Sequence, residues 1–200
     1  MLGTGSRHLG KLPHDMRLSV ENHAQPVKML LFIHFAWSLS TEANLPDLSP
    51  VPKTGSSALP DDESKQIWED RWEREWRRVW AWYDSREAQE ASVSQEEMIR
   101  ISSSGQQLHP VIPPFWVTEY GWAGIDKDAF MKWDRLTTAV APTHYPKLPL
   151  VDAWKAGINA ITVLPYSGYF ATRRNSTHLV VSDETMLDPK LFLKALDEQP

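Results

Sequence analysis

The feature that most constrains the fold is a run of aromatic residues at helical spacing. Apolar side chains recur every three or four positions at Trp68, Trp72, Trp76, Val79, Trp80 and Tyr83. At 100° per residue they share one face of a helix, so the spacing predicts a long amphipathic helix over residues 64–90. Opposite charges four positions apart, such as Asp70 and Arg74, favour the same helix. So many large rings on one face need something to cover them.

Two interpretations of this aromatic face stay open. A tryptophan stripe at helical spacing is most often core, and here it would dock the helix on a sheet. The alternative is a partner interface made by Trp68, Trp72, Trp76 and Trp80, because aromatic residues are enriched at the energetic centres of interfaces. The partner would then be another protein or a second copy of the chain, giving a homo-oligomer.

Composition narrows the function classes. A chain of 200 residues fits one domain. The formal charge of −5 argues against the basic surface that nucleic acid or an anionic membrane would require. The absence of cysteine excludes disulfides and thiolate catalysis, and no apolar run reaches the length of about 18 residues that spans a membrane. We expect a cytoplasmic protein that binds neither nucleic acid nor membrane.

The chain is predicted to form one domain in three parts. They are a flexible leader (1–16), an N-terminal helical part (17–106) and a compact α/β part (107–200). Before the long helix, the helical part contains a short strand at 17–20 and a Pro/Ser-rich linker at 40–63. Between them, the apolar segment from Pro26 to about Ser38 is predicted to be a helix, with a buried strand as the alternative because continuous apolarity hides the period.

The last part alternates strands and helices. Strands are expected at 115–120, 158–164 and 178–182, and helices at 126–138, at 148–156 and from 188 onward. Gly157 is a helix stop, and Asp188-Pro189 is a cap followed by a first helical turn. The fold class is therefore α/β or α+β, with a small mixed sheet, packed helices and the long Trp-rich amphipathic helix.

Several sequence motifs lack residues that their function requires. Residues 5–11 match the start of a phosphate-binding loop, but Leu12 stands where a Ser or Thr must hold magnesium. The motif is also expected to follow a strand, and residues 1–4 do not read as one. No two histidines have the spacing of metal ligands on one helix or strand. We therefore expect no cofactor and no metal. Two adjacent loop arginines, Arg173 and Arg174, are candidate ligands for a phosphate or carboxylate, although such arginines are usually solvated.

One segment carries plausible chemistry. Residues 113–122 read PPFWVTEYGW, in which a short apolar strand ends at Glu119 between aromatic rings. This segment resembles the strand that carries the nucleophilic glutamate in retaining glycoside hydrolases of the large (β/α)₈-barrel clan. The resemblance implies that Glu119 is a nucleophile and that Tyr120 and Trp122 lie near a sugar.

The rest of that family pattern is missing. Retaining hydrolysis needs a second carboxylate about 5 Å away, and in that clan it follows an asparagine, whereas the chain has no Asn-Glu pair. Asp126 or Asp152 would have to fold into that place. A complete barrel also needs about 250 residues. In the alternative interpretation, Glu119 caps a strand and the nearby tryptophans fill core.

These observations support two hypotheses. The first is a cytoplasmic binding or interaction module without intrinsic catalysis, which uses aromatic-rich surfaces and contacts a protein partner or a ligand. The second is a carboxylate-dependent hydrolase with Glu119 as its key residue and Tyr120, Trp122, Asp126, Arg173 and Arg174 as ligand-binding residues.

Overall fold

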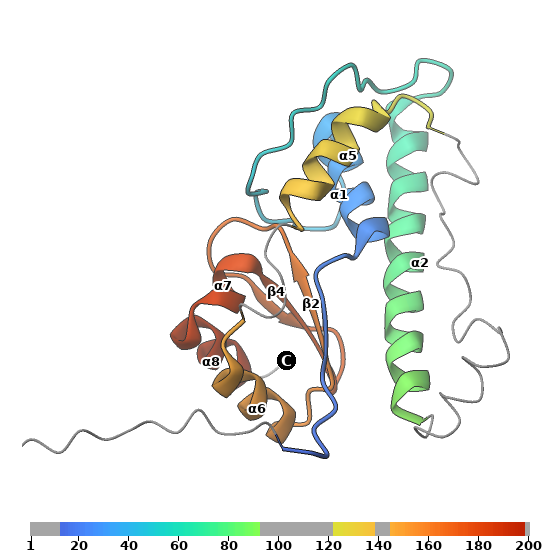
Figure 1. Cartoon of the computed structure of the whole chain (residues 1–200). Helices are drawn as coiled ribbons and strands as arrows, with labels where there is room; N and C mark the ends of the chain where they lie inside the picture. Colours follow the sequence, from blue (N-terminus) through green and yellow to red (C-terminus); the bar gives the residue numbers. More distant parts are fainter. Residues whose placement is uncertain (1–12, 93–121, 139–144, 199–200) are drawn as a thin grey trace, which may run out of the picture.

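The computed structural model describes residues 13–92, 122–138 and 145–198, and gives no side-chain positions at 85–92 and 148. It contains a four-stranded mixed sheet with helices on both sides (Figure 1), which confirms the α+β class. The strands are β1 (Ser19–Glu21), β2 (Ala160–Leu164), β3 (Ala171–Arg173) and β4 (His178–Ser182). The helices are α1 (Gln25–Ala36), α2 (Lys65–Ser92), α5 (Lys127–Leu136), α6 (Lys147–Lys155), α7 (Asp183–Leu187) and α8 (Pro189–Asp197).

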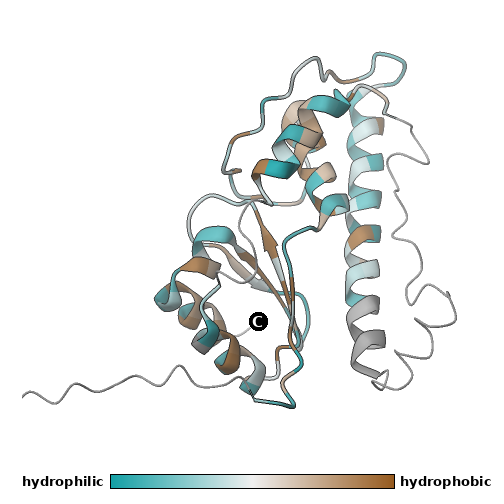
Figure 2. Ribbon diagram, viewed as in Figure 1, coloured by the Kyte–Doolittle hydropathy of each residue, from teal (hydrophilic) through white to brown (hydrophobic). Residues whose placement is uncertain are grey.

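The sheet joins the two ends of the described chain. Its strand order is β1-β2-β4-β3, with β1, β2 and β4 parallel and β3 antiparallel to β4. Every residue of β2 and β4 is buried, as expected for central parallel strands covered on both faces. Figure 2 shows these two strands mostly in the hydrophobic colour. The carboxyl ends of the parallel strands point toward α1 and α5 (Figure 1).

The first core lies between the sheet, α1, α2 and α5. Along α2, the side chains of Trp68, Trp72, Val79, Trp80 and Tyr83 are buried, and Trp76 is partly buried. The indole of Trp72 donates a hydrogen bond of 2.7 Å to the carbonyl of Leu30 in α1, so the ring is both packed and satisfied. The aromatic face of α2 is therefore covered within the chain, as the interpretation as core predicts.

The second core lies on the opposite face of the sheet. Alternate residues of β2 and β4 point there, with Ile161 beside Leu179 and Val163 beside Val181 in the parallel register. They pack against Ala153 of α6, Met186 of α7, and Phe192 and Ala195 of α8. Figure 1 shows these three short helices together on that side.

The segment 40–63 has no helix or strand, but it is attached along its length. Leu48 forms an isolated antiparallel bridge with Tyr166, and the indole of Trp133 donates to the carbonyl of Pro50 at 2.7 Å. Farther on, the amide of Ala58 donates to the carbonyl of Gly124 at 2.9 Å. Gly124 has a φ of +63°, and a Cβ there would collide with the backbone of Ala58, so glycine is needed at this crossing.

Most of the expected elements that fall on described residues are present. The helices predicted at 64–90, 126–138 and 148–156 correspond to α2, α5 and α6, and Gly157 follows α6 with a φ of +84°. The prediction omitted the three-residue β3 and the five-residue α7. The strand expected at 115–120 and residues 1–12 of the leader lie outside the described residues. None of the described helices is long and apolar enough to cross a membrane.

Candidate functional site

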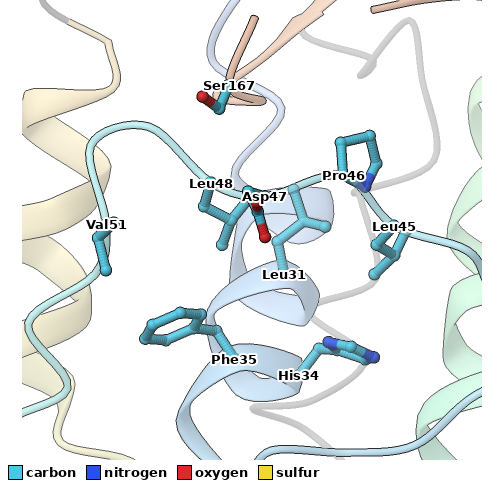
Figure 3. Close-up of a pocket in the computed structure, with 9 residues that line it drawn as sticks. All are labelled: Leu31, His34, Phe35, Leu45, Pro46, Asp47, Leu48, Val51 and Ser167. Atoms are coloured by element: carbon cyan, nitrogen blue, oxygen red, sulfur yellow. The ribbon is translucent and has the colours of Figure 1, made fainter.

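A pocket of about 420 Å³ lies where the carboxyl end of the sheet meets α1. Three sets of residues form its walls (Figure 3). They are Leu31, His34 and Phe35 of α1, then Leu45, Pro46, Asp47, Leu48 and Val51, and lastly Ser167. The volume is within the range of small-molecule sites, which are mostly apolar with a few polar groups. In open α/β sheets, ligands bind outside the carboxyl ends of the strands, and Ser167 follows β2 at that end.

Backbone pairing with the chain after β2 fixes the segment that closes this pocket. The amide of Ser49 donates to the carbonyl of Pro165 at 2.9 Å, and the amide of Ser167 donates to the carbonyl of Asp47 at 2.7 Å. These two bonds flank the bridge between Leu48 and Tyr166. The pocket wall is thus a short antiparallel pairing held by backbone hydrogen bonds.

The polar groups of the pocket are His34, Asp47 and Ser167. The Nε2 atom of His34 lies 3.1 Å from the Thr41 hydroxyl, and its ring packs 5.0 Å from the Trp72 ring. Burial lowers the pKa of His34; Glu69 opposes this shift and Lys65 adds to it. The imidazole is therefore neutral at pH 7. Asp47 and Ser167 are exposed, and none of the described lining residues is a Lys or an Arg.

A second polar cluster at the same end of the sheet is closed. Lys28 has no exposed surface; its ammonium lies 3.6 Å from Asp134 and donates to the Thr138 hydroxyl at 3.0 Å. Burial lowers the pKa of Lys28, and the attraction of Asp134 is the main effect that opposes this shift. Burial also raises the pKa of Asp183, and the charge of Lys28 opposes that shift. Shifted pKa values often mark functional sites, but ion-pair networks shift pKa values too. Because its ammonium is taken up by α5 and the two residues after it, we assign Lys28 to the attachment of α1.

A third cluster has the order of groups found in a catalytic triad. The Thr162 hydroxyl lies 2.9 Å from Nε2 of His178, and Nδ1 of that imidazole lies 3.3 Å from Asp84 of α2. A triad also needs a nucleophile that substrate can reach. Thr162 and His178 are only 1% and 0% exposed, and neither lines the pocket. This cluster holds α2 on the sheet.

The predicted anion ligands lie at the other end of the sheet. Arg174 donates to Asp84 at 3.1 Å, and its guanidinium lies 4.8 Å from the centre of the Trp80 ring. Arg173 donates to the carbonyl of Leu196 at 3.2 Å. The structure therefore does not bring the arginines together with Asp126, which belongs to α5.

Asp126 is the N-cap of α5. Its carboxylate accepts hydrogen bonds from the amide of Ser56 at 3.0 Å, the Ser56 hydroxyl at 3.1 Å, and the amide of Ala129 at 3.0 Å. These hydrogen bonds lower the pKa of Asp126; the bond from the Ser56 amide has the largest effect, and the bond from the Ala129 amide comes next. Asp152, the other candidate for a second carboxylate, lies on the exposed side of α6.

Trp122 is partly buried against the first core. Its ring lies 6.1 Å from that of Phe130 and 5.4 Å from the Lys127 ammonium. Glu119 and Tyr120 lie outside the described residues, so the hydrolase hypothesis stays a prediction. The assignment of Trp68, Trp72, Trp76 and Trp80 to a partner interface also stays a prediction; in this structure α1 and the sheet cover the first, second and fourth of them.

Sequence reasoning did not find the pocket. Its α1 residues lie in a continuous apolar segment that reads as core, and its other wall lies in a segment rich in Pro and Ser. The available signal was the pair Leu45-Pro46 followed by Leu48 and Val51, which places apolar side chains in a segment rich in Pro, Ser and Asp.

Comparison with known proteins does not assign the chain to a family. No family model, no curated protein and no solved structure matches the chain. Within the described part of the chain, no group of three His, Asp or Glu side chains is arranged to hold a metal ion.

Proposed function

We propose that the protein is a binding module without catalysis of its own, and that its ligand is a small molecule whose apolar body fills the pocket between α1 and residues 45–51. One observation carries this proposal: a pocket of about 420 Å³, walled mainly by apolar side chains, lies at the carboxyl end of the parallel strands of the sheet.

Exposed apolar side chains at the pocket support this assignment. Phe35 and Val51 are among the large hydrophobic residues with the most exposed surface, at 41% and 65%. Each costs free energy in contact with water, which a bound apolar group would recover at about 25 cal/mol per Å². Single exposed apolar residues are ordinary, but two that line one concave site indicate a place for a ligand.

The chemistry of the described polar groups fits binding better than turnover. The Nε2 atom of His34 is engaged by Thr41, and Figure 3 shows the side chains of His34 and Ser167 on opposite sides of the pocket. A base and a nucleophile would have to lie within hydrogen-bond reach of each other. A cytoplasmic location, and a protein partner or second copy for the aromatic surfaces, belong to this proposal as expectations from composition.

Titration of the protein with small aromatic compounds, followed by ligand-observed NMR, tests the proposal. Phe35→Ala should weaken binding at least tenfold, because losing a ring contact costs more than about 1.4 kcal/mol. Leu193→Ala is the matched control, since Leu193 is also a helical residue with 41% of its surface exposed but lies on α8, away from the pocket. Equal affinities of the wild type and Phe35→Ala would reject the pocket as the binding site.

A further inference from the structure

Among the described residues, the pocket contains one carboxylate, that of Asp47, without a counter-charge. Within the described part of the chain, the Asp47 carboxylate makes no hydrogen bond and no ion pair, although its backbone carbonyl accepts from Ser167. Figure 3 shows its two oxygens pointing into the pocket from the segment that closes it. A carboxylate beside apolar walls loses part of its hydration when a ligand enters, and this costs free energy unless the ligand supplies a partner.

None of the other described residues that line the pocket supplies that partner. His34 is neutral at pH 7 because burial lowers its pKa, and its Nε2 atom is engaged by Thr41. Lys65, whose charge influences His34, donates to the carbonyl of Ser38 at 2.8 Å and lies 3.6 Å from Glu69. The remaining lining side chains are apolar, except for the Ser167 hydroxyl. Asp47 is therefore the one charged side chain among the described residues that line the pocket.

We propose that the ligand is an organic cation, an amine with an apolar body, whose ammonium pairs with Asp47 while its body contacts Leu31, Phe35 and Val51. This inference rests on the proposed function and names the ligand class of the same site. The charge complementarity is specific, since an ammonium hydrogen-bonded to a carboxylate gains about twice as much as a neutral pair. A carboxylate ligand would meet a like charge and be excluded.

Three ligands that share a phenylpropyl body test the ligand class: 3-phenylpropylamine, 3-phenylpropanol and 3-phenylpropionate. Calorimetric titration of the whole chain should give the tightest binding for the amine, at least tenfold tighter than for the propionate, with the alcohol between them. Asp47→Asn should lower the affinity for the amine to that for the alcohol. The affinity for the alcohol should stay within about twofold of its wild-type value. Folding should be retained, because the carboxylate has no partner among the described residues.

Asp152→Asn is the control, since it removes the same charge from an exposed site on α6 and should keep the wild-type preference for the amine. The outcomes separate the two proposals. Equal binding of the three ligands to the wild type would overturn the cation inference and leave the binding function standing. No binding of any of them would overturn both. An amine preference that survives Asp47→Asn would also overturn the inference, because the selectivity would then come from another group.

Discussion

His178 shows how one buried side chain makes folding depend on pH. Burial, the largest cause, lowers its pKa below the usual 6.5; Asp84 opposes this shift, and Arg174 adds to it. Between the folded pKa and about 6.5, the unfolded chain binds more protons than the folded one, so stability rises with pH in that window. The stabilisation is complete above pH 6.5 and is lost as the pH falls through the folded pKa. His34, which also has a lowered pKa, contributes with the same sign.

We therefore expect the free energy of unfolding, measured with urea, to fall between about pH 7 and about pH 5. One histidine contributes a slope of at most about 1.4 kcal/mol per pH unit. His178→Gln should reduce this slope, even if the variant is less stable at every pH because it disturbs the contact with Thr162.

The comparison is repeated between about pH 8 and about pH 9, where a histidine does not titrate in either state. There the wild type and His178→Gln should have the same slope. Equal slopes in the acidic window as well would show that protonation of His178 is not linked to folding.

At the scale of elements, the pair Lys28 and Asp134 joins α1 to α5. Lys28→Met keeps the apolar stem but leaves Asp134, whose side chain is 13% exposed, without its cation. Removing one partner of a buried pair typically costs about 3–5 kcal/mol, whereas replacing both with apolar residues is often neutral. We expect Lys28→Met to cost about 3 kcal/mol and Lys28→Met combined with Asp134→Leu to lie within about 1 kcal/mol of the wild type.

Urea unfolding of the wild type, both single variants and the double variant gives the coupling energy. Strictly additive costs would mean that the two side chains act independently, and the assignment of Lys28 as the attachment of α1 would then be wrong.

The elements differ in how far the sequence predicts them. The helix α2 could be predicted because its aromatic spacing and its i,i+4 charge pairs agree, and α8 because Asp188 accepts from the amides of Lys190 and Leu191 as a cap should. By contrast, β3 and α7 are three and five residues long, too short to show a period.

The candidate site was much harder to predict than the helices. The two walls of the pocket come from segments that meet only through the pairing of Leu48 with Tyr166, a contact that local pattern does not encode. The role of Lys28 was also not predicted, since a lysine in an apolar helix reads as a surface position until α5 is known to supply Asp134 and the segment after α5 the Thr138 hydroxyl. Polar partners distant in sequence emerge only from the tertiary fold.

At the scale of the whole molecule, β1 joins the N-terminal part of the chain to the C-terminal strands of the sheet. Removing residues 1–16 keeps β1, so we expect an unchanged melting temperature. Removing residues 1–21 deletes the pairing of β1 with β2, together with the half-buried Leu18 and Val20, which pack on the second core. At this size each kcal/mol lost lowers the melting temperature by about 2–4 °C, so the longer deletion should lower it by several degrees.

Calorimetry of the two truncated chains measures this difference. The same melting temperature for both would mean that β1 adds nothing to the sheet. A lowered value for the shorter deletion would mean that the leader contacts the fold, contrary to the prediction from its sequence.

Because the molecule has two cores, tryptophan fluorescence and circular dichroism report on different parts of it. Of the ten tryptophans in the chain, eight pack in or against the first core, namely Trp37, Trp68, Trp72, Trp76, Trp80, Trp82, Trp122 and Trp133. Most of the indole emission therefore follows the packing of α1, α2 and α5, although Trp154 of α6 also emits. Circular dichroism at far-ultraviolet wavelengths registers α6, α7 and α8 as well. Coincidence of the two signals during denaturation would show that the sheet transmits unfolding from one face to the other, and a separation would show that each face melts by itself.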